Sequence, residues 1–164
     1  MARINAVHVV GSGILAGMVI NIFGAFAWGA ILGAEYMRQL EIQLPGKTVP
    51  LSMGWGILMG IVAIWLYVSL RPQYGAGART AALAGAVTWL LGHALPSYSI
   101  WAFGLLSGSL VAGASSLAMV QLLLATLAGA AFYDFVGDVV EMKDARLFRQ
   151  SAELPGSEQP IQGP

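Results

Sequence analysis

Few polar side chains interrupt the apolar stretches of this chain, and they limit the chemistry available there. Asn21 lies near the middle of the first stretch and Gln121 near the middle of the fourth. Both carry amides, which form hydrogen bonds without ionising, and an amide inside a membrane needs a partner. We predict that both face the interior of a helix bundle and bond across it. The alternative is a polar station on the path of a solute.

A second pair of candidates lies near the predicted outer boundary of the membrane. Glu35 follows the first apolar stretch, and His93 lies near the end of the third. A histidine beside a carboxylate can titrate near neutral pH, whereas the simpler alternative is a histidine bonded to a carbonyl group or to interfacial water. The only other histidine, His8, begins the first stretch at the opposite side of the membrane. This separation argues against a haem held between the two histidines of one copy.

Three acidic residues follow the fourth stretch at helical spacing. Asp134, Asp138 and Glu141 are separated by four and then three positions, so they share one face of a helix. Carboxylates on one face can bind a hard cation, but we predict a solvated acidic face and no metal site. The chain has no cysteine and no motif of a zinc protease, a serine hydrolase or a nucleotide loop. We therefore predict no catalytic residue and no cofactor, although the sequence leaves open whether the protein is an enzyme.

These residues are positioned by four apolar stretches that contain no Asp, Glu, Lys or Arg. The stretches are Ala6–Gly33, Leu51–Leu70, Thr80–Leu95 and Leu105–Tyr133. A bilayer core needs about 20 apolar residues, and only 10% of the chain is charged, against roughly 25% in soluble domains. We predict an all-α membrane protein, an up-down bundle of four transmembrane helices within residues 1–142, with a polar, disordered tail at 143–164. The spans are expected at about 6–33, 51–70, 78–97 and 105–135.

The charges of the connecting segments predict the orientation. An arrangement with both termini inside places six cations in the cytoplasm and leaves Arg38 and Lys47 outside. The six are Arg3, Arg71, Arg79, Lys143, Arg146 and Arg149. This agrees with the positive-inside rule and predicts a multi-pass protein of the bacterial cytoplasmic (inner) membrane. The lipid bilayer is thus the first predicted partner, and the net charge of zero gives no general attraction to nucleic acid.

Small residues recur at helical spacing on all four stretches. Close backbone approach between helices drives association in lipid, and small residues permit it. The glycines that we predict to mediate packing are Gly13, Gly17, Gly24, Gly56, Gly60, Gly85 and Gly92. Such faces can serve either a homo-oligomer interface or packing within one bundle. Because every stretch carries one, we favour packing within one bundle.

Several segments together resemble a family of small four-span bacterial integral membrane proteins of unknown function. The segments are 31–37 (ILGAEYM), 71–79 (RPQYGAGAR), 84–96 (AGAVTWLLGHALP) and 120–133 (VQLLLATLAGAAFY). The resemblance covers about three quarters of the chain and implies a four-span bundle. No activity follows from it.

Three classes of function fit these observations. We favour a non-enzymatic membrane subunit or scaffold that acts through close helix packing, either with itself as a homo-oligomer or with a larger membrane complex. The first alternative is an oligomeric channel or transporter for a small neutral or apolar solute, since ionisable side chains are missing from the span centres. The second is a membrane protein associated with a pigment, a quinone or a haem, which would use aromatic residues and His93.

Overall fold

Four helical segments make up the fold, which a computed structural model describes for residues 6–40 and 48–152. Two of the segments contain a short π-helical turn, labelled η. The first segment comprises α1 (Ala6–Phe26), η1 (Ala27–Leu32) and α2 (Gly33–Leu40). The second is α3 (Thr48–Tyr74), and the third comprises α4 (Ala78–Trp89), η2 (Leu90–Ala94) and α5 (Leu95–Ala102). The fourth is α6 (Gly108–Ala152). The described residues contain no strand, which confirms the predicted all-helical class.

Among the described residues, three helices are long and apolar enough to cross a membrane. They are Ala6–Leu40, Thr48–Tyr74 and Gly108–Leu147. Large apolar side chains such as Ile22, Phe26 and Trp65 are exposed on them, as expected for surfaces that face lipid. These features indicate an integral membrane protein. The segment α4–η2–α5 is not one of the three, since Arg79, His93 and Pro96 lower its apolar character.

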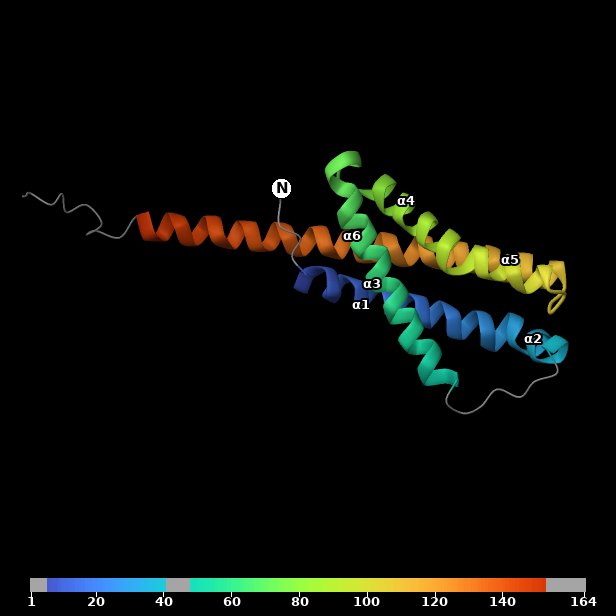
Figure 1. Cartoon of the computed structure of the whole chain (residues 1–164). Coiled ribbons are helices and arrows are strands. Elements are labelled where there is room, and N and C mark those ends of the chain that lie inside the picture. Colours follow the sequence, from blue (N-terminus) through green and yellow to red (C-terminus); the bar gives the residue numbers. More distant parts are fainter. Residues whose placement is uncertain (1–5, 41–47, 153–164) are drawn as a thin grey trace, which may run out of the picture.

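The helices form a bundle in which α3 and α6 each contact both α1 and α4. Helix α6 runs opposite in direction to α1 and α4, and α3 crosses α1 obliquely (Figure 1). The core combines small residues such as Ala16, Ala84 and Ala125 with a few larger ones, of which Tyr67 and Ile64 are fully buried.

Glycine makes the crossing of α1 and α3 possible. A Cβ atom placed on Gly13 would lie 2.5 Å from the Cα atom of Ile61, and one on Gly17 would lie 2.5 Å from the Cα atom of Ile57. A Cβ atom on Gly60 would overlap with the backbone of Gly13 and Gly17. Any larger side chain would therefore push the two backbones apart, which is why small residues are found where membrane helices approach closely.

The last helix extends well past the bundle. Helix α6 has 45 residues, about 67 Å of helix, and its final part has no other helix beside it in Figure 1. The predicted tail 143–164 thus begins inside this helix, and only its residues after 152 lie outside the described part. Good helix formers explain the continuation, and Arg146 and Arg149 favour a helix C-terminus through their charge.

Candidate functional site

A polar cluster lies where α6 leaves the bundle. The hydroxyl of Tyr67, on α3, donates a hydrogen bond of 2.6 Å to the Oδ2 atom of Asp134, on α6. The same hydroxyl accepts a hydrogen bond of 3.1 Å from the backbone N–H of Gly77, which precedes α4. Since Tyr67 is fully buried, its hydroxyl uses both its donor and an acceptor position inside the protein. One side chain thus joins α3, the α3–α4 turn and α6.

Arg71 completes this cluster one helical turn after Tyr67. Its Nη2 atom lies 3.3 Å from the Oδ1 atom of Asp134, and Oδ1 forms no hydrogen bond with the residues that the structure describes, so the contact is an ion pair of looser geometry. The guanidinium carbon also lies 5.8 Å from the ring centre of Tyr67 and 5.5 Å from that of Tyr133. Such distances allow cation–π attraction, so the guanidinium is held by a carboxylate and two aromatic rings.

The turn that follows Arg71 depends on glycine. Gly75 and Gly77 have φ angles of 81° and 123°, which residues with a side chain rarely adopt. The hydroxyl of Thr80 donates to the carbonyl oxygen of Gly75 at 2.8 Å and closes the turn. This conformation presents the N–H of Gly77 to Tyr67, so the RPQYGAGAR segment has a structural role in the cluster.

The cluster differs from the predicted acidic face. Asp134 turns inward to Tyr67 and Arg71, whereas Asp138 is exposed. The side chain of Glu141 lies outside the described part, and no group of three possible metal ligands occurs among the described residues. Tyr67 and Arg71 were not predicted as partners of Asp134. The available signal was the pair of opposite charges, Arg71 and Asp134, at the same end of two predicted spans.

The two intramembrane amides bond to backbone carbonyl groups rather than to each other. The Nδ2 atom of Asn21 donates to the carbonyl oxygen of Met53 at 3.1 Å and connects α1 to α3. The Nε2 atom of Gln121 donates to the carbonyl oxygen of Ile20 at 2.6 Å and connects α6 to α1. These two bonds involve neighbouring residues of α1, Ile20 and Asn21, and each amide uses a donor to connect two helices.

Glu35 and His93 have different partners in the structure. Glu35 accepts hydrogen bonds from Arg38, at 2.9 Å to its Nε atom, and from Gln39 at 2.7 Å. Gln39 also accepts a hydrogen bond of 2.8 Å from the backbone N–H of Ser107, so it links α2 to the start of α6. His93 lies instead on η2, where its Nδ1 atom is 2.9 Å from the hydroxyl oxygen of Ser97. The structure thus places these two candidates in separate local contacts.

All seven glycines proposed to mediate packing lie against another helix of the same chain. Gly13, Gly17, Gly56 and Gly60 form the α1–α3 crossing, where Gly56 faces the amide of Asn21. A Cβ atom on Gly85 would lie 3.1 Å from the hydroxyl of Thr126, and one on Gly92 would lie 2.9 Å from the sulfur of Met59. One on Gly24 would lie at an ordinary contact distance from Gln121. These glycines therefore pack within one copy of the chain.

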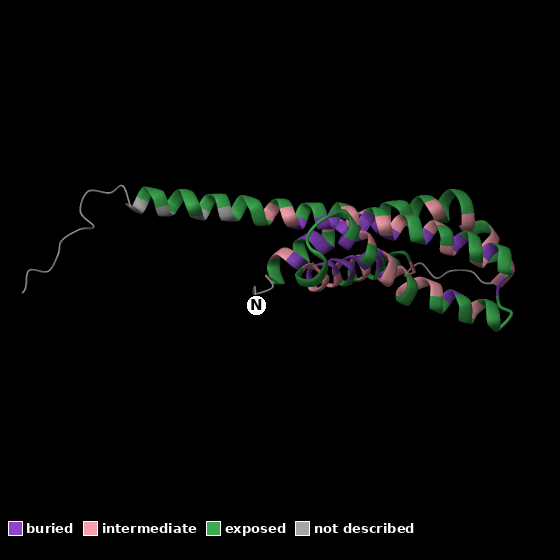
Figure 2. Ribbon diagram, turned by 90° about the horizontal axis from the view of Figure 1, so that it is seen from above, coloured by how far each residue is buried: buried purple, intermediate pink, exposed green. Residues whose placement is uncertain are grey.

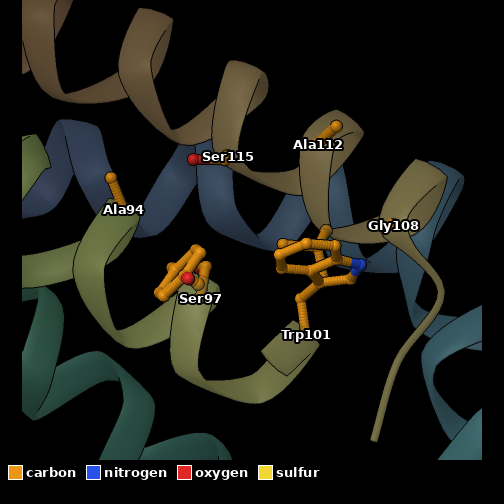
Figure 3. Close-up of a pocket in the computed structure, with 8 residues that line it drawn as sticks. Ala94, Ser97, Trp101, Gly108, Ala112 and Ser115 are labelled. Atoms are coloured by element: carbon orange, nitrogen blue, oxygen red, sulfur yellow. The ribbon is translucent and has the colours of Figure 1, made fainter. Parts of the chain in front are cut away.

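An open groove lies between α5 and α6. It is at the opposite end of the bundle from the cluster of Tyr67, Arg71 and Asp134, which we call the Tyr67 cluster. The groove has a volume of about 390 Å³, and its lining includes Ser97, Trp101 and Gly108. Figure 3 shows the indole of Trp101 reaching from α5 toward Gly108 and Ala112 of α6. The ring of Trp101 also contacts that of Tyr98 in a tilted arrangement, with the ring centres 5.6 Å apart and an angle of 52° between the planes. The groove is apolar and aromatic, as expected for a surface that contacts lipid chains.

Comparison with known proteins gives no relative from which a role can be transferred. No family model matches the chain, and no curated protein and no solved structure matches it. The family resemblance of the sequence therefore stays a prediction. The candidate site is defined by its own geometry: a buried tyrosine, a carboxylate and a guanidinium that fix the point at which α6 leaves the bundle.

Proposed function

We propose that this chain is a non-enzymatic integral membrane subunit or scaffold that acts through helix packing. The observation that carries the proposal is the length and anchoring of α6. Its part up to Tyr133 packs in the bundle, the Tyr67 cluster holds it at Asp134, and the helix then continues through Ala152. A long helix that is held rigidly at its base suits the presentation of a binding surface at a fixed place beside the membrane.

The contacts of the polar side chains favour this function over transport. Asn21, Gln121 and Trp89 each donate a hydrogen bond to a backbone carbonyl group of another helix. A solute path needs polar groups that can exchange partners, and breaking these bonds would separate helices. We therefore assign these side chains to cohesion of the bundle.

The proposed threading has four spans, with α4–η2–α5 as the third and both termini in the cytoplasm of a bacterium. The loop charges support this threading, because Arg71 and Arg79 lie at the same end of the bundle as the exit of α6. The opposite directions of α1 and α6 are also compatible with termini on one side (Figure 1). With this orientation, the part of α6 beyond Asp134, which we call its free part, extends into the cytoplasm.

Native mass spectrometry of the full chain, released from membranes in mild detergent, tests the proposal. We expect a symmetric oligomer or a defined complex with another membrane protein, without a bound pigment. Flux of a neutral solute such as glycerol into liposomes provides the contrasting measurement. A monomer that accelerates this flux well above protein-free liposomes would overturn the proposal in favour of transport.

A further inference from the structure

Helix α6 carries an apolar stripe at coiled-coil spacing, which begins at the edge of the bundle and continues along the free part of the helix beyond Asp134. Phe132, Phe135, Val139 and Met142 follow one another at intervals of three, four and three residues, and we call them the exit stripe. Their side chains are between 42% and 64% exposed. This spacing is that of the a and d positions of a heptad repeat, which place apolar side chains along the seam between two helices. In Figure 2 the part of α6 that extends beyond the bundle is coloured mostly as exposed.

The register of the stripe begins inside the bundle. Ala125 and Ala118, seven and fourteen residues before Phe132, are buried, whereas Ala128, which precedes Phe132 by four residues in the same heptad pattern, is exposed. A strict heptad line drifts by about 20° per seven residues around a straight α-helix. At Phe132 the line faces outward at the edge of the bundle, and beyond Tyr133 the side chains of the stripe are at least 42% exposed.

We propose that the exit stripe pairs with the exit stripe of a second copy in a parallel coiled coil. This inference rests on the proposed function and names its partner. Copies inserted with the same threading leave the membrane on the same side and in the same direction, so their α6 helices are parallel. The pairing would bury the exposed Phe135, Val139 and Met142 of both copies at once.

The flanking charges favour a second copy over an unrelated partner. With Phe132 and Val139 at a positions, Asp138 occupies a g position and Lys143 the e position of the next heptad. In parallel coiled coils these two positions lie opposite each other across the seam. Asp138 of each copy would thus face Lys143 of the other, and symmetry gives two attractive pairs. Both side chains are exposed, and no ion pair joins either of them to a side chain that the structure describes.

The same register predicts where the coil ends. The next a and d positions are Arg146 and Arg149, and two copies would bring like charges together there. The apolar seam is therefore short, and such a coil needs the high local concentration that anchoring in one membrane provides. Helix α6 also runs without a break past Asp134, so the free part continues outward instead of turning to lie along the lipid surface (Figure 1).

Cysteine cross-linking of the full chain in native membranes tests the geometry, because the natural sequence contains no cysteine. Single variants Val139→Cys and Met142→Cys place a thiol on the seam, whereas Val140→Cys places it on a neighbouring face of equal exposure to that of Val139. Under mild oxidation, we expect roughly fivefold more disulfide-linked dimer from the seam variants than from Val140→Cys. Equal yields at all three positions, or no dimer at the seam, would overturn the inference.

Charge exchange tests the pairing of Asp138 with Lys143. In the Met142→Cys background, Asp138→Lys alone and Lys143→Asp alone each create two repulsive pairs, so both should lower the dimer yield several-fold. The double exchange should restore it, and a double variant that stays as low as the single ones would contradict the pairing. If native mass spectrometry shows an oligomer but no seam cross-links form, this inference alone is contradicted. If both measurements show a monomer, the proposed function is contradicted as well.

Discussion

The hydroxyl of Tyr67 and the carboxylate of Asp134 are separated by 67 residues in the chain and by 2.6 Å in the fold. Their hydrogen bond closes α3 against α6 at the point where α6 becomes free of the bundle. Arg71 adds an ion pair to the same carboxylate. This polar cluster therefore adds specific contacts to the helix packing that directs the free part of α6, and with it the exit stripe.

Removing this hydroxyl should destabilise the bundle. Tyr67→Phe leaves the N–H of Gly77 without its acceptor and the Oδ2 atom of Asp134 without its donor, so we expect a loss of about 1–3 kcal/mol in the free energy of unfolding. Tyr74→Phe is the matched control, because Tyr74 is exposed at the end of the same helix. Thermal unfolding in mild detergent provides the measurement. Equal unfolding temperatures for the two variants would show that the cluster does not hold the helices.

Enlarging Gly60 should separate α1 from α3. A Cβ atom at Gly60 meets backbone atoms of Gly13 and Gly17, which cannot move aside like a flexible side chain. We expect Gly60→Ala to cost roughly 1–3 kcal/mol of stability. Gly54→Ala, on the same helix, faces open space and should be neutral or stabilising by up to about 1 kcal/mol. Unfolding of both variants in one detergent compares them, and a neutral Gly60→Ala would contradict the close crossing.

Replacing Gln121 distinguishes an amide that holds helices together from one that binds a solute on its way through the membrane. Gln121→Leu removes the hydrogen bond to the carbonyl oxygen of Ile20, and such bonds between membrane helices contribute about 0.6–2 kcal/mol. We expect a lower unfolding temperature. Ser116→Ala is the control, since the hydroxyl of Ser116 donates within α6, to the carbonyl oxygen of Ala112, and not to another helix among the described residues. Unchanged stability of Gln121→Leu, together with loss of a measured solute flux, would refute the structural role.

Removing the hydroxyl of Ser12 should stabilise the protein instead of destabilising it. The hydroxyl oxygen of Ser12 is buried between helices and has no hydrogen-bond partner among the described residues. A buried hydroxyl without a partner is unfavourable, so Ser12→Ala should raise the free energy of unfolding by about 1 kcal/mol. The same thermal unfolding assay measures this gain. A clear loss of stability would mean that the hydroxyl has a bonding role in the membrane-embedded protein.

The residue pattern of each stretch was sufficient to predict the helices and the class of the protein. Uncharged stretches such as Ala6–Gly33 and Leu51–Leu70 lie within helices that are long and apolar enough to span a membrane. This succeeds because hydropathy and helical periodicity are local properties of a sequence. The third stretch is less apolar, and the assignment of four spans remains part of the proposal.

The hydrogen-bond partners of the polar side chains were determined by the tertiary structure alone. The sequence determined that Asn21 and Gln121 are amides in apolar surroundings and that Asp134 follows a span. It could not determine that the amides bond to the carbonyl groups of Met53 and Ile20, or that Asp134 turns inward to Tyr67. Those partners depend on the rotation of each helix about its axis and on the oblique crossing of α3 over α1. These angles are set by the packing of all four helical segments together, and no local stretch of residues encodes them.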